Sequence, residues 1–434
     1  MRIIVHGEDA RQAREAQSLL QAAGVEAQAL AGPYRAAPDG ADIVIFAEAA
    51  GAEHARGRAE GALSGTNAPM AALLGARFSS PAPLGIEPPA PFQGIVALDA
   101  PPSLLAAQIE AHVRLALARD ELVRRRQTAS ALGIEASFAE TPRDLRVLYV
   151  GGPSALFLLL EQELAALNGN VVAAFSSFAG FDHLHDERFD AVVLNGATNP
   201  STALSLCSAL RRNASLYHLP TMVIAAPSDT ETAKAALERG ASATVEANAS
   251  PQASLGWLFE AIRRERLRYQ TENALSALRD RMGDPRTGLM QTAPFETHLA
   301  RLAADHHASG RPLSIAVLRV LPAHGANEPP EQIWRKGFTE IGSIAARLMR
   351  EADSGAAFGR DVVVVALPAT DRAGAKRTAE RIASVAECTA FASGDNGAAP
   401  LIFEQSIAEL QPGEGGEGLL WRALHAIEIE SISA

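Results

Sequence analysis

The sequence has few of the features that mark secreted, membrane-inserted or nucleic-acid-binding proteins. It contains two cysteines, Cys207 and Cys388, which give neither a disulfide framework nor a zinc-ligand spacing and are typical of a reducing compartment. No apolar run approaches the roughly 20 residues that cross a bilayer. The net charge of -11 argues against a general nucleic-acid or anionic-membrane surface. Because the N-terminus reads as a strand and not as a signal peptide, we expect a cytoplasmic protein without membrane insertion and without a nucleic-acid partner.

The length and composition indicate two or three globular domains. A chain of 434 residues is too long for one ordinary domain, and its 47% hydrophobic content lets each domain bury its own core. Apolar strands alternate with helices over residues 1–118 and again over residues 144–266, which predicts βαβ units and parallel sheets. The segment Phe189–Leu194 is continuously apolar, as buried parallel strands are. The two regions therefore form an internal repeat of domain size.

Two further segments separate these repeats from each other and from the rest of the chain. Residues 119–143 read as a charged helix end and a linker. Residues 267–283 carry a broken apolar stripe that includes Leu275, Leu278 and Met282, and they predict a stalk helix. The stripe fits a stalk that pairs with a second copy of the chain, and it fits equally a linker satisfied within one chain. A homodimer is therefore one expectation.

The last unit, residues 284–434, follows a different plan. Asp284–Leu289 reads as a turn, Leu313–Leu318 as a strand and Ile341–Met349 as part of a long helix. A β-hairpin, a second helix, a further strand and a final helix follow. This order predicts an α+β domain with a central sheet.

Both repeats resemble response-regulator receiver domains, which implies two flavodoxin-like (βα)5 domains. Receiver chemistry needs an acidic pair after the first strand to hold Mg²⁺ and an aspartate at the end of the third strand to accept a phosphoryl group. In the first repeat the phosphoacceptor position falls on Ala47, although Glu8 and Asp9 retain part of the acidic pair. In the second repeat it falls on Asn195, and Gly151–Gly152 replaces the acidic pair. We expect two pseudo-receivers that serve dimerisation or partner docking.

The last unit resembles the GGDEF (diguanylate cyclase) family, whose fold is nucleotidyl-cyclase-like. Asp284–Leu289 is close to the opening motif of that family, and Leu313–Leu318 matches the strand that ends in a metal-binding aspartate in active enzymes. That position is Arg319 here, and a cation at this point would repel Mg²⁺. Cyclases position an α-phosphate and neutralise its charge with two metal ions, so this change argues against activity.

The hairpin signature of the family is also altered. It reads Gly359-Arg360-Asp361-Val362, where an active enzyme has two glycines followed by two acidic residues. Glycine is needed at the second position because the nucleotide approaches the backbone closely, and Arg360 obstructs that approach. One surviving carboxylate, Asp361, does not make a two-metal site. We expect no cyclase activity and no bound metal.

A second motif of the family is intact. Arg350-x-x-Asp353 lies nine and six residues before Gly359, at the family's spacing for its product-binding inhibitory site, and Arg381 falls where many members carry an accessory arginine. Guanidinium groups can pair with phosphate oxygens or with the O6/N7 edge of guanine, and a carboxylate can accept from guanine N1–H and N2–H. The resemblance thus implies cyclic di-GMP as the ligand of these three residues. Arg281-x-x-Asp284 has the same letters, and we interpret that match as chance.

Several other residues are weaker candidates for a functional site. His183 and His185, and likewise His306 and His307, lack further metal ligands nearby and are interpreted as solvated loop or helix-surface histidines. Trp334 fits a partner contact and fits a helix surface at least as well.

The resemblance covers essentially the whole chain and implies a non-catalytic cyclic di-GMP effector of alphaproteobacterial cell-cycle control. Relatives of this kind act at a cell pole as adaptors that help to deliver a cell-cycle regulator to the ClpXP protease through a smaller adaptor protein. Two alternatives remain open. One is a residual diguanylate cyclase or GTP-binding protein in which Asp361 still holds a metal; the other is a scaffold that binds no nucleotide.

Overall fold

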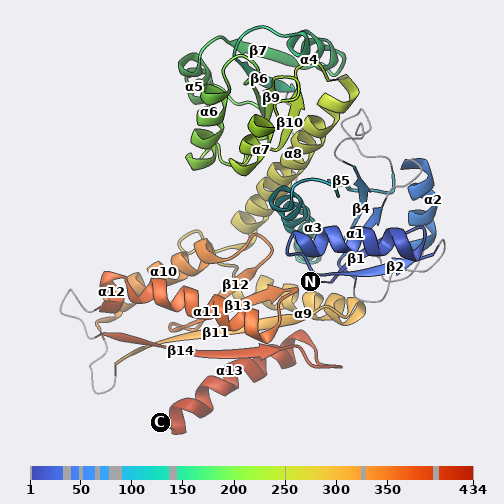
Figure 1. The fold of residues 1–434 in the computed structure, drawn as a ribbon. Helices are drawn as coiled ribbons and strands as arrows, with labels where there is room; N and C mark the ends of the chain where they lie inside the picture. Colours follow the sequence, from blue (N-terminus) through green and yellow to red (C-terminus); the bar gives the residue numbers. More distant parts are fainter. Residues whose placement is uncertain are drawn as a thin grey trace. The chain divides into compact units, whose positions relative to one another are not determined.

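The computed structural model describes residues 2–32, 41–47, 52–63, 69–77, 90–135, 144–249, 251–323, 329–393 and 400–433. The chain divides into two compact units (Figure 1): unit 1 comprises Met1–Ala116 and Glu140–Gln270, and unit 2 comprises Leu117–Ala139 and Thr271–Ala434. Within the described ranges, no helix is both long and apolar enough to span a membrane.

Two long helices carry the segments that the sequence marks as connections. Residues 119–131 of the predicted linker continue helix α3 (Pro102–Ala131), and residues 136–143 lie outside the described residues. The predicted stalk, 267–283, is not a separate helix, because helix α8 runs without interruption over Pro251–Met282. The limits of the predicted domains stay a prediction.

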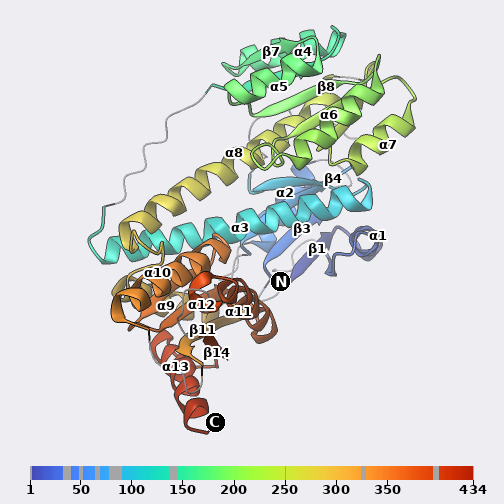
Figure 2. The same cartoon turned by 90° about the vertical axis from the view of Figure 1, so that its left-hand side faces the viewer.

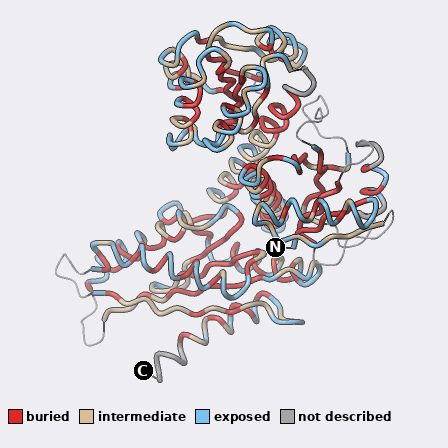
Figure 3. Tube along the Cα trace, in the orientation of Figure 1, coloured by how far each residue is buried: buried red, intermediate tan, exposed pale blue. Residues whose placement is uncertain are grey.

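Unit 1 contains two parallel five-stranded sheets. The first has the order β2-β1-β3-β4-β5 and consists of β1 (Ile3–Gly7), β2 (Ala27–Ala31), β3 (Ile43–Ala47), β4 (Ala71–Ala76) and β5 (Gly94–Ala97). Helices α1 (Ala10–Ala22), α2 (Ala52–Ala62) and the N-terminal part of α3 follow its strands. All residues of β1, β3, β4 and β5 are buried, which explains why these strands read as continuous apolar runs (Figure 3).

The second sheet of unit 1 repeats this topology. Its order is β7-β6-β8-β9-β10, with β6 (Arg146–Val150), β7 (Asn170–Ala174), β8 (Ala191–Asn195), β9 (Thr221–Ala225) and β10 (Ala243–Glu246). The helices are α4 (Ala155–Ala166), α5 (Ser177–Asp186), α6 (Pro200–Arg212), α7 (Thr230–Glu238) and the N-terminal part of α8. Both sheets therefore follow the 2-1-3-4-5 order of flavodoxin-like domains, in which the first and third strands are neighbours. The predicted fold of the two repeats is confirmed.

Unit 2 contains one antiparallel sheet with the order β12-β13-β11-β14. Its strands are β11 (Leu313–Pro322), β12 (Ser354–Phe358), β13 (Val362–Pro368) and β14 (Leu401–Glu409). Its helices are α9 (Thr292–Ser309), α10 (Glu331–Leu348), α11 (Arg372–Glu387), α12 (Ala390–Ser393) and α13 (Gly416–Ser433). From β11 to β14 the chain follows a β-α-β-β-α-β plan, and the predicted α+β class is confirmed.

The sheet of unit 2 is covered on both faces. Residues alternate along β11, so that Ile315 and Val317 join one core while Ala316 and Leu318 join the other. The first core also includes residues of α9, α13 and the C-terminal half of α3, and the second includes residues of α10 and α11 (Figures 1 and 2). Residues 117–135 are thus part of the packing of unit 2.

Candidate functional site

In the first receiver-like domain, an arginine occupies the sheet edge where a phosphoacceptor would lie. Ala47 is the last residue of β3, and its carbonyl accepts hydrogen bonds from Arg58 Nη2 at 2.6 Å and from Gln12 Nε2 at 3.3 Å. The carboxylate of Asp9 caps α1 by accepting from the backbone N–H groups of Arg11 and Gln12, each at 2.8 Å. The remnant of the acidic pair is therefore used to begin a helix.

In the second receiver-like domain, an amide and backbone groups fill the corresponding edge. Asn195 ends β8, and its Nδ2 donates to the carbonyl of Gly152 at 2.8 Å, which also accepts from the Tyr149 hydroxyl at 2.9 Å. Gly151 has a φ of 127°, and a Cβ at this position would lie 2.9 Å from Cβ of Asn195. An acidic side chain at 151 would therefore be strained, so this edge is built without the acidic pair.

Arg319 on β11 pairs with Asp361, the carboxylate that the hairpin retains. Arg319 lies opposite Val362 in the β11–β13 ladder, and its Nε donates to Asp361 Oδ2 at 3.1 Å. The backbone of Asp361 also accepts from the N–H of Val320 at 2.8 Å. Gly359 begins the hairpin turn with a φ of 60°, a conformation that favours glycine. Arg319 and Asp361 thus form an ion pair across the β11–β13 ladder.

The Arg360 residue of the hairpin tip is attached to helix α10. Its carbonyl accepts from Nε1 of Trp334 at 2.9 Å, and its guanidinium carbon lies 6.0 Å from the centre of the Trp334 ring. Its Nη1 also lies 3.3 Å from Oε2 of Glu331. Trp334 is buried, so its interpretation as a helix-surface residue is wrong. The indole fixes the hairpin tip instead.

The three residues predicted to bind a dinucleotide meet at the C-terminal end of α10. The N–H of Asp353 donates to the carbonyl of Arg350 at 2.9 Å, and the N–H of Arg350 donates to Oδ2 of Asp353 at 2.8 Å. These two bonds close the turn that leads from α10 into β12. Arg381, on α11, donates from Nη2 to the carbonyl of Leu348 at 3.0 Å. Arg350 and Arg381 are exposed, and both guanidinium groups therefore lie on the surface near this turn.

The carboxyl group of Asp353 differs from the accessible acceptor that the motif suggests. Asp353 is 4% exposed, and its Oδ1 has no hydrogen-bond partner among the described residues. Burial raises the pKa of Asp353 to about 6, and the hydrogen bond and charge of Arg350 limit this rise while the charge of Glu121 adds to it. Contact between this carboxylate and a ligand therefore requires that the group be uncovered.

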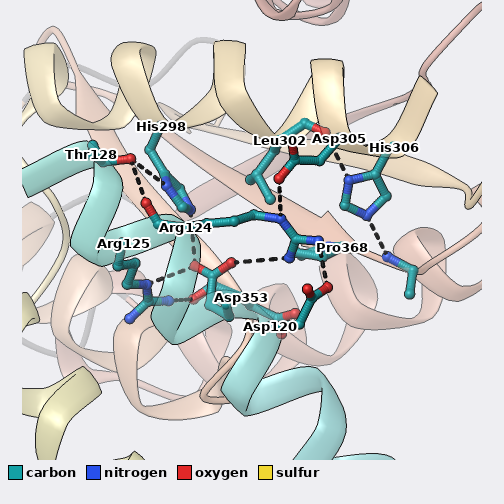
Figure 4. A network of polar contacts seen from close by, with 12 residues as sticks. Asp120, Arg124, Arg125, Thr128, His298, Leu302, Asp305, His306, Asp353 and Pro368 are labelled. Atoms are coloured by element: carbon teal, nitrogen blue, oxygen red, sulfur yellow. Dashed lines mark hydrogen bonds and ion pairs between the residues drawn. The ribbon is translucent and has the colours of Figure 1, made fainter. Parts of the chain in front are cut away.

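Polar side chains of α3 lie against this turn and were missed in the sequence, where residues 119–143 read as a linker. Arg125 Nη2 donates to the carbonyl oxygen of Asp353 at 2.6 Å (Figure 4) and to that of Glu351 at 3.1 Å. Its Nε donates to Glu121 Oε1 at 2.7 Å, and the same oxygen lies 2.9 Å from Nε2 of His298 on α9. The i,i+4 spacing of Glu121 and Arg125 was the available signal.

The charge of Glu121 is stabilised by its neighbours although the residue is completely buried. Burial alone would raise the pKa of Glu121, but the charges and hydrogen bonds of His298, Arg125 and Arg124 hold it at about 2. Arg124 in turn donates from Nε to Asp305 Oδ2 on α9 at 2.8 Å. The C-terminal half of α3 is thus attached to unit 2 by a buried ionic network.

His306 is part of the same region and is not the surface residue that the sequence suggests. It is buried, and its Nδ1 donates to the carbonyl of Leu302 at 2.7 Å while Nε2 accepts from the N–H of Ala369 at 3.2 Å (Figure 4). Burial, assisted by the charge of Arg124, lowers the pKa of His306 to about 4. A neutral ring with both nitrogens hydrogen-bonded explains its place in the core.

Comparisons with known proteins find similarity among solved structures alone. No protein-family model and no curated protein matches the chain. A response regulator from Chloroflexus aurantiacus is 19% identical, with a TM-score of 0.24, over 30% of this chain and 98% of its own. The coiled coil and GGDEF domain of DgcB from Caulobacter crescentus, solved in complex with c-di-GMP, is 20% identical, with a TM-score of 0.29, over 39% of this chain and 89% of its own. The GGDEF domain of PA1120 from Pseudomonas aeruginosa is 21% identical, with a TM-score of 0.29, over 35% of this chain and 89% of its own. At this level the likeness assigns neither a family nor an activity to the chain.

Proposed function

We propose that the chain is a non-catalytic effector that binds cyclic di-GMP through Arg350, Asp353 and Arg381. The observation that carries this proposal is the meeting of the three residues at the end of α10, where two exposed guanidinium groups lie near a turn that holds a carboxylate. The guanidinium groups suit phosphate oxygens and the O6/N7 edge of guanine, and they can also stack on a purine. The carboxylate, once uncovered, accepts from guanine N1–H and N2–H.

The same proposal makes unit 2 catalytically inactive. Phosphoryl transfer by a cyclase depends on metal ions held by carboxylates. The carboxylate of Asp361 is paired with Arg319, which supports the loss of this chemistry. Substitution of Val362 for an acidic residue removes the second carboxylate of the hairpin.

The cellular role belongs to the proposal and rests on resemblance. The receiver–receiver–GGDEF order resembles the cyclase PleD, and the changes in all three parts resemble its non-catalytic relative PopA more closely. We infer a signalling adaptor that acts as a homodimer at a cell pole and brings a cell-cycle regulator to ClpXP through a smaller adaptor protein. Ligand binding would act by favouring one conformation of the chain over another.

Retention of radiolabelled cyclic di-GMP by the purified chain tests the binding part of the proposal. Removal of one charge-assisted contact by Arg350→Ala or Arg381→Ala should weaken binding by about 10- to 100-fold. Arg347→Ala is the matched control, because Arg347 is an exposed arginine in the last turn of α10 and its side chain contacts Ser343. Binding that is equally strong in all four proteins would overturn the assigned site.

Incubation with GTP tests the proposed absence of catalysis. The chain is supplied with GTP and either Mg²⁺ or Mn²⁺, and the products are separated by chromatography. We expect no cyclic di-GMP above a blank without protein. Product that disappears in an Asp361→Ala variant would establish the residual-cyclase alternative instead.

A further inference from the structure

Four buried polar side chains of α3 lie against helix α9 and against the turn of residues 350–353. We call Glu121, Arg124, Arg125 and Thr128 the α3 clasp. Thr128 Oγ1 lies 3.1 Å from Nδ1 of His298, and Arg125 donates to the carbonyl oxygen of Asp353 (Figure 4) and to that of Glu351. The clasp therefore contacts the same turn that the proposed ligand would contact.

The apolar attachment of this part of α3 is small. Among described residues 117–135, the buried apolar side chains in the core of unit 2 are those of Ala118, Leu122 and Ala129, and the partly buried Ile134, beyond the end of α3, packs against the same core. Two of these are alanines, which bury little apolar area each. The contacts between this part of α3 and the rest of unit 2 are thus mainly polar. Polar contacts of this kind can be replaced by contacts between the turn and a polar ligand.

The clasped state also leaves oxygen atoms without hydrogen bonds. Among the described residues, Asp353 Oδ1, Ser354 Oγ and Glu121 Oε2 are buried and accept no hydrogen bond, although Nη1 of Arg124 lies 3.9 Å from Glu121 Oε2. A buried polar group without a partner is unfavourable, and a donor that reaches it gains the full benefit of a hydrogen bond. Guanine offers two such donors to Asp353, so the ligand can supply what the clasp does not.

We propose that the α3 clasp is an internal competitor of the dinucleotide, and that Arg125 must leave the Arg350–Asp353 turn before the ligand binds fully. This inference rests on the proposed function. The clasp holds the carbonyl side of the turn and keeps Asp353 covered; the ligand takes the uncovered carboxylate and the two exposed arginines. Ligand binding and release of residues 117–131 are therefore linked: binding favours release by the same free energy by which release favours binding.

A calorimetric titration with cyclic di-GMP tests this competition in the full-length chain. Arg125→Gln removes the forked contact with the two carbonyl oxygens and should tighten binding on the order of tenfold. Arg125→Lys retains the charge beside Glu121, should tighten binding less, and replaces the glutamine variant if that protein does not fold. Arg126→Gln removes the same charge from an exposed position of the same helix and should bind as the wild type does.

Hydrogen exchange provides a second measurement that does not depend on a variant. Saturation of the wild type with cyclic di-GMP should raise the exchange of the backbone amides of residues 121–128. Unchanged or slower exchange at these amides would overturn the clasp.

The outcomes separate this inference from the proposed function. Tighter binding by Arg125→Gln, or binding by this variant alone, supports the clasp. Binding by the wild type that is equal or weaker in Arg125→Gln overturns the clasp and leaves the proposed function standing. Binding by neither protein overturns both.

Discussion

Replacement of Asp353 by asparagine should stabilise the protein at neutral pH. The pKa of Asp353 is raised from 3.8 to about 6 in the folded protein, so between these values the folded state binds a proton that the unfolded state has lost. The contribution of protonated Asp353 to the free energy of unfolding is therefore complete below about pH 4, and it is lost as the pH rises through about 6. A pKa raised from 3.8 to about 6 corresponds to a cost of about 3 kcal/mol for the ionised carboxylate. Since relaxation reduces such costs, we expect a gain of about 1–3 kcal/mol at neutral pH.

Asparagine suits this test because it has the shape of aspartate and no charge. Its side-chain oxygen can still accept the N–H of Arg350, which now donates to Oδ2 at 2.8 Å. The charge of Glu121 disfavours a carboxylate at position 353 and favours a neutral amide. The substitution therefore keeps the turn and removes the unfavourable charge.

The measurement is the free energy of unfolding of wild type and Asp353→Asn at a series of pH values. Urea unfolding can be followed by tryptophan fluorescence in a Trp257→Phe background, so that the remaining tryptophans, Trp334 and Trp421, report unit 2. The lowered pKa of His306 makes stability fall as the pH falls through about 4, which opposes the effect of Asp353. Because both proteins contain His306, the difference between their free energies of unfolding isolates the effect of Asp353.

Two results would refute the reasoning. One is a variant that is less stable than the wild type at neutral pH; the other is a difference between them that does not change with pH. The account also expects Asp353→Asn to lose affinity for cyclic di-GMP, because an amide cannot accept both guanine donors as a carboxylate does. A residue that lowers stability while it supports binding is the pattern expected of a ligand site.

Other predictions concern packing, charge and the receiver edges. Glu121→Ala should destabilise unit 2 by about 3–5 kcal/mol in urea unfolding, because His298 is left buried without its carboxylate; a loss below about 1 kcal/mol would contradict the assigned role. Gly337→Ala should cost about 1–3 kcal/mol in the same assay, since a Cβ would lie 2.2 Å from the Phe391 ring; an unchanged midpoint of unfolding would show that the ring moves freely. Asn195→Asp should form no aspartyl phosphate when incubated with acetyl phosphate and Mg²⁺, because the neighbouring acidic pair is absent. Mass spectrometry would detect the added phosphoryl group, and a phosphorylated product would contradict the prediction of a pseudo-receiver.

Much of the fold could be predicted because its signals are local. Buried parallel strands are continuous apolar runs, and their alternation with helices is visible without any knowledge of packing. The hairpin could be located because Gly359 supplies the turn between two short strands. The extents of helices were less certain: α8 continues through Arg263–Arg268, where charges interrupt the apolar stripe, since charged side chains on a long helix can be paired or solvated.

The burial of site residues could not be predicted, because it depends on segments far away in the sequence. Arg125 and Asp353 are 228 residues apart, and no periodicity or spacing brings them together. Trp334 and His306 carry polar atoms that favour a surface interpretation, yet each is buried with its polar atoms hydrogen-bonded. Motif letters identified which residues gather at the turn, and only the structure shows that one of them, Asp353, is buried.

A calorimetric titration of the intact chain with cyclic di-GMP, beside Arg350→Ala, tests the central claim most directly. The account predicts micromolar or tighter binding by the wild type, with about two dinucleotide molecules per protomer if they bind as an intercalated dimer, and strong weakening in the variant. Binding that Arg350→Ala leaves intact would contradict the assigned site. No binding by the wild type or by the clasp variant Arg125→Gln would contradict the effector role itself, and the Arg350–Asp353 turn would then be an ordinary structural element.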